Sequence, residues 1–551
     1  MREQGYPHFQ GRGHLSRRQF LRVGTRAGLG LAAGAMSGAV PWPQQVWAQQ
    51  ISDTPRTGGV LTMWIGGDPP NFDVHQNSTY LTQHITAPCY NNLVQYDPLD
   101  PKRIVPDLAE RWEVSSDGRR YTFYLVQGVR FHDGKPFSSA DVKVSLDRMR
   151  QPPSGVISIR REAFAAVDDV QTPDPSTVVV LLKQPNPSLP AQLAGGHMSV
   201  YPKHVLEAQG DMKKVIVGTG PFKLKKYTRG VSVELERNPD YFVQGRPYLE
   251  GITLYIMPDP NSAYAAFRTG RLLLLRFLEL GLGKRAEQEL GHQITLQRTR
   301  GLGFFAFNMN TKRKPWDDPR VRQAASLAID RRTSITAVSE GEGELGGFLP
   351  PSSLLALPTE ELTAIPGYGA DLEANRARAR QLLTEAGFPD GFKTTMLTRK
   401  LPLSEKLSVY VKDQLAKIGI QATLDVQESA TAFDILNRRG FDTAPWWTAF
   451  AVDDPEAVFS EFYTCEAARN YASLCVPEVD QLFQQQSQAL DPEQRKRLVH
   501  EMERTLLQSH GSSVLHWHNY LTGHWPQVRN WVQPPSLYNN QRLQDVWLAK
   551  A

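Results

Sequence analysis

Two histidines late in the chain have the type and spacing that a metal site would use. His516 and His518 lie in the segment VLHWHNY, where a strand would place both imidazole rings on one face. Imidazole nitrogens are common zinc ligands, but a zinc site needs at least one further ligand, and the sequence offers no obvious one here. We therefore favour two hydrogen-bonded strand residues, and we keep a metal-dependent hydrolase as an alternative.

A glycine-rich stretch is the other formal match to a chemical motif. GEGELG, residues 341–346, fits the spacing G-x-G-x-x-G, but no strand is predicted before it, and Glu342 and Glu344 would repel a phosphate. The sequence contains no G-x-S-x-G, H-E-x-x-H or C-x-x-C motif. No residue set for catalysis is recognisable, so we expect a protein that is not an enzyme and has no cofactor or metal centre.

The elements that must position any site alternate between strands and helices. Strands are predicted just after Gly59, as two runs within 121–133, at 177–183 and as two runs within 218–242. Helices are predicted from Ser138 or Ser139, within 316–332, from Asp371 to Gly387 and from Asp491. Serine and aspartate cap helix N-termini, and Pro319 and Pro492 suit a first helical turn. This alternation indicates an α/β architecture, and about 500 mature residues require more than one lobe.

The first 48 residues have the composition of a targeting peptide. Arg17 and Arg18 precede a glycine-diluted apolar run over 27–40, which is shorter than the roughly 20 residues of a membrane span. Val46 and Ala48 then stand where a signal peptidase reads small residues, so cleavage after Ala48 is expected. The segment resembles a twin-arginine signal, which implies the twin-arginine export machinery as a partner and a soluble periplasmic protein as the product.

The net charge excludes a class of partner. The first 48 residues carry six arginines against one acidic residue, a net charge of +5, and the whole chain also has +5. The mature part is therefore neutral overall. Binding to nucleic acid or to an anionic membrane needs a surplus of Lys and Arg facing phosphates, so neither partner is expected.

Three cysteines in an exported chain suggest one disulfide and one remaining thiol. Cys465 and Cys475 lie in FYTCEAARNYASLC, where a bond between them would close a short loop. Cys89 is then expected to be a buried, small apolar residue.

Several segments together resemble a family of bacterial proteins. They are YTFYLVQGVRFHDGKPFSSADV, GTGPFKLKKY with ERNPDYF, FNMNTKRKPWDDPRVRQAASLAIDR, ARQLLTEAGFPDGF, NYASLCVPEVDQLF and SSVLHWHNY. Their order and spacing are similar to those of the extracellular solute-binding proteins of family 5, the dipeptide, oligopeptide and nickel type that feeds ABC importers. The resemblance implies an α/β, two-lobed periplasmic-binding-protein clamp of class II type with an additional inserted N-terminal domain.

The resemblance also implies domain boundaries. Lobe I would comprise 55–88, 203–302 and 520–551, the inserted domain 89–202, and lobe II 303–519. The chain would cross between the lobes near residues 302 and 519, and the lobes would close over the solute by a hinge motion.

The segment APWWTAFAVDDPEAVF, residues 444–459, is similar to the stretch that lines the solute cleft in this family. The resemblance implies ligand contacts from Trp446, Trp447, Thr448, Phe450, Asp453 and Asp454. Peptide binders usually carry an aspartate at the position of Phe450, where it pairs with the peptide amino group, and a phenyl ring cannot do this. Asp453 or Asp454 would be the substitute, although we favour a capping role for them at a helix beginning near Pro455.

These observations predict a periplasmic, monomeric binding component that delivers an organic solute to membrane permease subunits. The aromatic side chains suggest a solute with apolar or ring-shaped surface, such as a glycoside, a modified peptide or a cationic metabolite. Ordinary di- and oligopeptides are the second interpretation.

Overall fold

The structure is a computed structural model that describes residues 54–77, 79–158, 160–539 and 541–549. Arg17, Arg18 and Ala48, on which the export prediction rests, lie outside this part of the chain. No helix within the described ranges combines the length and the hydropathy that a membrane span requires.

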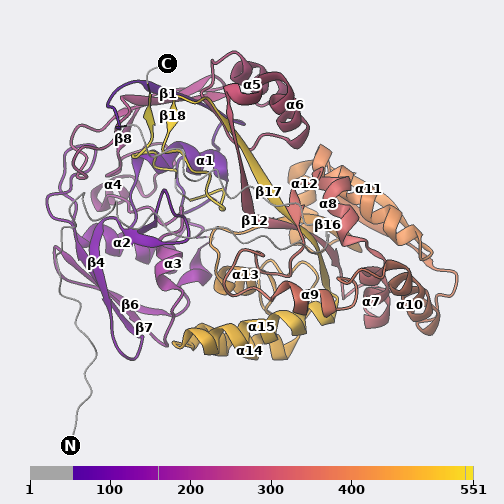
Figure 1. The fold of residues 1–551 in the computed structure, drawn as a ribbon. Coiled ribbons are helices and arrows are strands. Elements are labelled where there is room, and N and C mark those ends of the chain that lie inside the picture. Colours follow the sequence, from indigo (N-terminus) through magenta and orange to yellow (C-terminus); the bar gives the residue numbers. More distant parts are fainter. Residues whose placement is uncertain (1–53, 78, 159, 540, 550–551) are drawn as a thin grey trace, which may run out of the picture. The chain divides into compact units, whose positions relative to one another are not determined.

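The largest element of the described residues is an eleven-stranded mixed sheet (Figure 1). Its order is β15 (Ile420–Gln427), β14 (Phe392–Arg399), β16 (Thr443–Ala449), β12 (Thr295–Met309), β17 (Ser512–His524), β11 (Leu274–Leu275), β1 (Val60–Ile65), β10 (Gly251–Ile256), β9 (Ser232–Arg237) and β8 (Phe222–Thr228), with β13 (Gly343–Glu344) beside β17. β14 pairs in parallel with β15 and β16, and β1 with β10 and β11, whereas the other pairs are antiparallel.

The long strands β12 and β17 connect the two halves of this sheet, as Figure 1 shows. They pair from Thr295 opposite His524 to Asn308 opposite Ser512. Their register is interrupted between Arg300 and Phe304, which is where the resemblance places the crossing at residue 302. A β-bulge bends a strand and increases its twist, so this interruption separates the two halves of the pair.

Helices cover both faces of the sheet half that β12 shares with β14, β15 and β16. They are α7 (Pro319–Ala328), α8 (Arg331–Ser339), α9 (Thr359–Ala364), α10 (Leu372–Glu385), α11 (Pro402–Ala416), α12 (Ser429–Asn437), α13 (Pro455–Phe462), α14 (Pro477–Gln488) and α15 (Pro492–Ser509). Side chains alternate along β12, so Phe304 packs into one core and Phe305 into the other. Burial on both faces explains the nearly continuous apolar run FFAF.

The helices outside this half lie beside β1, β8 to β11 and the start of β12, and the last strands form a separate pair. These elements are α1 (Tyr80–Thr86), η1 (Ala87–Cys89), α4 (Lys203–Gln209), α5 (Pro260–Arg268), α6 (Leu280–Leu290), η3 (Gly291–Gln293), β18 (Val528–Arg529) and β19 (Trp547–Leu548). Cys89 is buried in their core, and burial raises the pKa of its thiol. The segment before β8 passes close to it, because a Cβ at Gly220 would lie 2.3 Å from the carbonyl carbon of Cys89.

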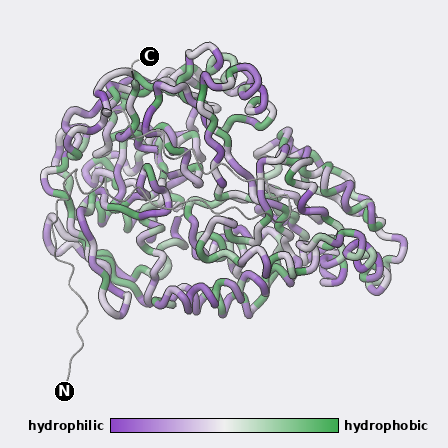
Figure 2. The backbone as a smooth tube through the Cα atoms, viewed as in Figure 1, coloured by the Kyte–Doolittle hydropathy of each residue, from purple (hydrophilic) through white to green (hydrophobic). Residues whose placement is uncertain are grey.

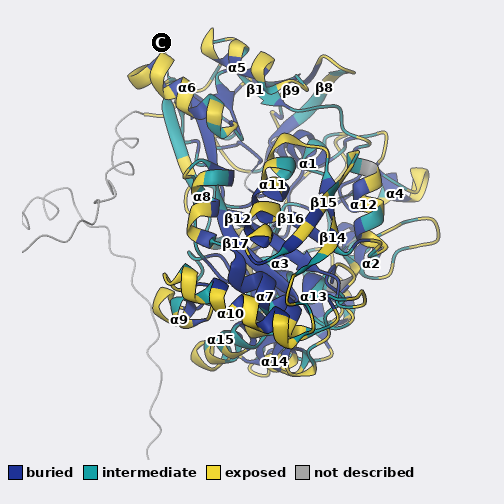
Figure 3. Ribbon diagram, turned by 90° about the vertical axis from the view of Figure 1, so that its right-hand side faces the viewer, coloured by how far each residue is buried: buried dark blue, intermediate teal, exposed yellow. Residues whose placement is uncertain are grey.

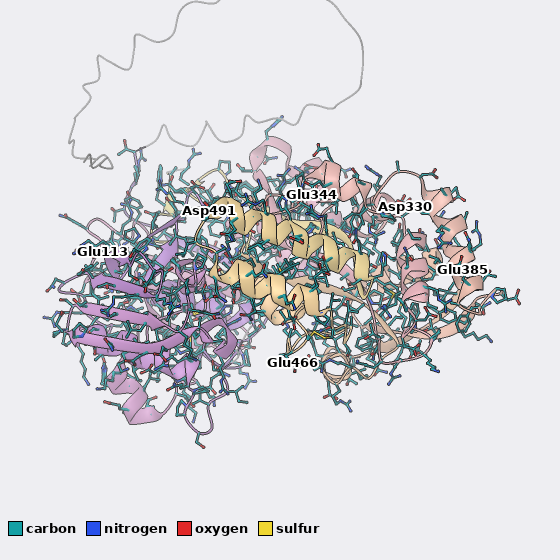
Figure 4. All side chains as sticks on the ribbon, turned by 90° about the horizontal axis from the view of Figure 1, so that it is seen from below. Glu113, Asp330, Glu344, Glu385, Glu466 and Asp491 are labelled. Atoms are coloured by element: carbon teal, nitrogen blue, oxygen red, sulfur yellow. A yellow bond between two sulfur atoms is a disulfide. The ribbon has the colours of Figure 1, made fainter. Side chains whose placement is uncertain are left out.

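A third core forms around a four-stranded antiparallel sheet in the order β4-β5-β7-β6. Its elements are β2 (Val94–Tyr96), β3 (Ile104–Pro106), β4 (Ala109–Val114), β5 (Arg120–Leu125), α2 (Ser139–Arg150), η2 (Arg161–Phe164), β6 (Val167–Asp174), β7 (Thr177–Leu182) and α3 (Leu189–Leu193). Glu113 marks β4 in Figure 4, which also shows α14 and α15 side by side. Arg148 of α2 forms a buried ion pair with Asp73, which lies outside this unit.

The predicted helix starts agree with the structure. Ser138, Asp318, Asp371 and Asp491 are N-cap residues, and Ser138 forms a capping box with Asp141. The second strand predicted within 121–133 is wrong, since only an isolated bridge from Arg130 to Pro136 follows β5 there. A tight turn at residues 133–134 brings these two residues together before a second strand can develop.

Hydropathy and burial follow the same pattern. The helices carry hydrophilic and hydrophobic residues in alternation in Figure 2, and Figure 3 shows β12 and β17 largely buried beneath helices with exposed outer faces. In α15, for example, Met502 and Leu506 are buried one turn apart, while Glu501 and Gln508 are exposed. The sheet is therefore the buried frame that holds the candidate site.

Candidate functional site

The two adjacent tryptophans of β16 point to opposite faces of the sheet. Trp446 is 6% exposed and packs edge-on against Phe433 of α12, with the ring centroids 5.2 Å apart. Trp447 is half-buried on the face of Phe305, its cross-strand partner. Its indole Nε1 is buried without a hydrogen-bond partner, and Gly303 provides room for it, because a Cβ there would lie 2.8 Å from that nitrogen.

Phe450 is part of a buried aromatic cluster. Its side chain is 3% exposed, and its ring centroid lies 5.3 Å from that of Phe462 and 5.7 Å from that of Phe304. Thr448, the residue opposite Phe304 in the neighbouring strand, is buried as well. A carboxylate at position 450 in this structure would be buried among aromatic rings without a cation, which is energetically unfavourable.

Asp454 and Asp453 differ in their surroundings. Asp454 is the N-cap of α13, where its Oδ1 accepts hydrogen bonds from the Glu456 backbone N–H at 2.9 Å and from Ser188 at 2.8 Å. Arg495 of α15 forms an ion pair with the same carboxylate at 3.0 Å. The structure thus shows the capping role for Asp454, whereas Asp453 is exposed.

The two histidines of β17 are hydrogen-bonded to serines of α8. Nδ1 of His516 lies 2.8 Å from Oγ of Ser334 and its Nε2 lies 2.7 Å from Oγ of Ser339, which also bonds His518. Burial lowers the pKa of His516 to about 3 and that of His518 to about 4, so both rings are neutral. No group of three potential metal ligands occurs among the described residues.

The acidic residues of the glycine-rich stretch are also paired. Glu342 forms an ion pair with Arg298 and Glu344 with Arg300. The stretch contributes β13 to the sheet.

A polar cluster forms where three distant segments meet. Arg160 comes from the loop after α2, Glu461 and Arg469 come from α13 and the loop after it, and Tyr538 comes from the segment after β18. Burial raises the pKa of the Tyr538 hydroxyl, and the charges of Arg160 and Arg469 oppose this rise. The three segments therefore bring two cations and one carboxylate close to the same phenol.

The disulfide-closed loop holds one of these cations. Cys465 is bonded to Cys475 in the structure, and Arg469 lies between them. Arg469 pairs with Glu461 at 3.1 Å, donates to the hydroxyl of Tyr471 at 3.1 Å and lies over the Phe462 ring. These contacts orient the guanidinium of a side chain that remains 44% exposed.

Several buried polar atoms around this cluster have no partner. They include Oε1 of Gln83, Nε2 of His197, Nε of Arg160 and the hydroxyl of Tyr520. The His197 ring lies 4.7 Å from the Tyr538 ring, centroid to centroid. A cavity of about 20 Å³, lined in part by Gln83, Gly196 and Tyr538, adjoins them. Buried polar groups are normally hydrogen-bonded, so this concentration of free donors and acceptors is typical of a binding site.

These residues were missed by the sequence analysis for different reasons. The position of Arg469 was indicated in part, because it lies in the loop that the spacing of Cys465 and Cys475 predicts. Arg160 and Tyr538 lie in irregular segments without periodicity, and nothing in the local pattern predicts that they meet.

The mixed sheet, with its two halves joined by β12 and β17, is the architecture of a two-lobed protein. The structure of DppA from Helicobacter pylori in complex with the peptide STSA superposes with a TM-score of 0.78 at 24% identity, covering 90% of this chain and 99% of that one. AppA from Bacillus subtilis in complex with a nonapeptide gives a TM-score of 0.76 at 24% identity, covering 90% of this chain and 100% of that one. At these identities the likeness establishes the two-lobed periplasmic-binding-protein fold.

The family model for bacterial extracellular solute-binding proteins, family 5 Middle, matches residues 103–470, and the chain belongs to this family. The glutathione-binding protein GsiB of Salmonella typhi is 29% identical over 368 residues, covering 66% of this chain and 69% of that protein. A probable di/tripeptide-binding protein of Pseudomonas aeruginosa is 27% identical over 480 residues, covering 82% and 89%.

Proposed function

We propose that the protein is the periplasmic substrate-binding component of an ABC importer, which captures a peptide-like organic solute between its lobes and delivers it to membrane permease subunits. The observation that carries this proposal is the polar cluster of Arg160, Glu461, Arg469 and Tyr538. Its members come from segments that the predicted domain boundaries assign to the inserted domain, lobe II and lobe I. The family supports this class of solute, and so do its relatives that are named for binding glutathione or di- and tripeptides.

A solute site that is divided between two lobes explains how capture and release alternate. A solute that contacts both sides stabilises the closed arrangement only by binding it more tightly than the open one. The bend between Arg300 and Phe304 is the position at which β12 would absorb the hinge rotation. Release then follows when the permease favours the open arrangement.

The residues of the cleft segment are proposed to act unequally. Trp447 offers a half-buried indole with a free N–H, and Asp453 is an exposed residue whose carboxylate accepts a hydrogen bond from Ser353. The cleft segment is supported from inside the fold by its buried residues, which are Trp446, Thr448, Phe450 and Asp454. Without an aspartate at position 450, the solute is expected to differ from an ordinary peptide in how its amino group is held. Ordinary di- and oligopeptides remain the second candidate, and the exposed Asp453 favours them.

The solute itself is the first test. We expect mass spectrometry of protein purified from the periplasm to reveal a bound peptide-like compound, which calorimetry then measures against the variants. Arg469→Gln and Trp447→Ala should each weaken binding about tenfold or more, because each removes a charge-assisted bond or a stacking surface. Arg438→Gln is the control, because Arg438 forms an exposed ion pair with Asp434 at the C-terminal end of α12. Unchanged affinity in both site variants would refute this site.

We further propose export by the twin-arginine machinery. Replacing Arg17 and Arg18 by Lys should leave the precursor in the cytoplasm, which fractionation and immunoblotting detect. A normal periplasmic yield of this variant would exclude the twin-arginine route.

A further inference from the structure

Arg276 is a buried arginine that has no acidic partner among the residues that the structure describes. Arg276 follows β11 and is 2% exposed. Its Nη1 lies 3.2 Å from Nδ1 of His84, and its guanidinium lies over the rings of Phe277 and Trp531 at 4.7 and 5.3 Å. Nε2 of His84 is 2.7 Å from the Leu537 carbonyl oxygen. That nitrogen must therefore carry the proton, so Nδ1 accepts from Arg276 and supplies no negative charge.

The two remaining donors of Arg276 form one edge. Nε and Nη2 are both buried and neither has a hydrogen-bond partner. These two nitrogens form one edge of the planar guanidinium group, and this edge can bind a carboxylate through two parallel hydrogen bonds. No ion pair to Arg276 exists among the described residues.

Other buried arginines show what normally satisfies this group. Arg148 directs two nitrogens to the carboxylate of Asp73, at 2.6 and 3.2 Å. Arg331 donates to the carbonyl oxygens of Val514, Ser326 and Gly367 at 2.8 to 3.0 Å. Arg276 has the same burial without comparable acceptors. A buried cation of this kind is unfavourable for folding and needs another explanation.

The position of Arg276 connects it with the polar cluster. β11 pairs with β17 at Leu275 and Gly523, and the Phe277 ring contacts that of Tyr520 with centroids 5.5 Å apart. Burial is the main cause that lowers the pKa of His84 and of His197, and the charges of Arg276 and Arg160, respectively, lower these two pKa values further. Arg276 and Arg160 therefore act on neighbouring buried imidazoles, and neither imidazole supplies a negative charge to Arg276.

We propose that the solute carries a carboxylate that binds the free Nε and Nη2 edge of Arg276, so that the protein selects acidic peptide-like compounds. This inference rests on the proposed function. The solute enters while the lobes are apart. Its carboxylate then supplies the negative charge that the Arg276 guanidinium lacks within the fold. Binding would then also relieve the cost of the unpaired guanidinium, which couples solute capture to stability.

The test compares matched acids and amides on protein freed of bound solute by unfolding and refolding. The probes are glutathione and alanyl-glutamate, each as free acid and with its carboxylates amidated. We expect the acids to bind wild type at least about tenfold more tightly than the amides, because two charge-assisted hydrogen bonds are lost. Arg276→Met should abolish this preference, and Arg276→Lys should retain part of it. Arg271→Met, at an exposed arginine of the same segment, should retain all of it.

Thermal melting separates a binding role from a structural one. Without solute, Arg276→Met should melt at or above the temperature of Arg271→Met, because it removes an unpaired buried charge. A lower melting temperature would show that the guanidinium supports the fold and would overturn the proposal. Equal binding of acids and amides, or no binding of any acid, would overturn it as well. A neutral co-purified peptide-like solute would overturn it while leaving the proposed function intact.

Discussion

Arg148 and Arg276 are buried to nearly the same degree, yet they meet opposite surroundings. Arg148 faces a carboxylate that is itself fully buried and is further bonded by the backbone N–H groups of His75 and Met212. Arg276 faces aromatic rings and one neutral imidazole. Burial alone therefore does not distinguish a structural charge from a ligand-binding one. The hydrogen-bond acceptors around the cation do distinguish the two, because a buried cation that only supports the fold is normally paired with such acceptors.

The largest effect is expected from breaking the compensated pair. Arg148→Met leaves Asp73 buried without its cation and should lower the free energy of unfolding by about 3–5 kcal/mol. Urea denaturation measures this change. Arg276→Met, measured in parallel without solute, should show no such loss. Similar losses in both variants would remove the distinction drawn between the two arginines.

A buried carboxyl group extends the comparison to the opposite charge. Glu503 of α15 is fully buried and accepts hydrogen bonds from the backbone N–H groups of Leu349 and Leu357, at 3.0 and 3.1 Å. Burial raises the pKa of Glu503 to about 7, although these hydrogen bonds oppose the rise. The native state thus holds a proton that the unfolded state releases above its ordinary pKa near 4.5.

Because the native state holds this proton, the stability contributed by Glu503 falls as the pH rises. The contribution of Glu503 to stability is complete below about pH 4.5 and is lost as the pH rises towards 7, by roughly 3 kcal/mol at most. Denaturation between pH 4.5 and 8 should show this fall, and Glu503→Gln should show a flatter profile. A wild-type stability that increases over this range, with the same slope in the variant, would contradict the assignment.

The smallest effect concerns the loop that carries Arg469. Cys465→Ser with Cys475→Ser opens a loop whose cysteines are 10 residues apart, which should cost about 2–3 kcal/mol through the added freedom of the unfolded chain. Solute affinity should fall as well, because the contacts of Arg469 would no longer be fixed. Calorimetry and denaturation measure the two effects. Unchanged affinity in the double variant would mean that the bond serves stability alone.

Local chemistry made part of this structure predictable. The N-caps Ser138, Asp318, Asp371 and Asp491 depend on short-range geometry, and the sequence shows them directly. The function of Asp454 was ambiguous, because a cap and a ligand-binding carboxylate look alike until Arg495 and Ser188 are found beside it.

Long-range packing made the rest unpredictable. Arg276 lies in the segment RLLLLRFLEL, where its burial depends on His84 and Trp531, residues that are far away in the sequence. Arg160 likewise follows an irregular stretch whose neighbours come from later segments. No periodic pattern encodes a missing partner, so the unsatisfied edge of Arg276 becomes visible only in three dimensions.

The core around β1 has a consequence for the order of assembly. It combines Leu61 and Met63, near the start of the described residues, with Trp531 and Val546 near their end. A ribosome must therefore synthesise nearly the whole chain before this core can close, whereas the lobe that contains residues 304–517 holds its contacts within a later, continuous stretch. Contacts of such high sequence separation form slowly. β1, the first of the described strands, is therefore completed by residues near the end of the described chain, and its core closes only after nearly all of these residues have been made.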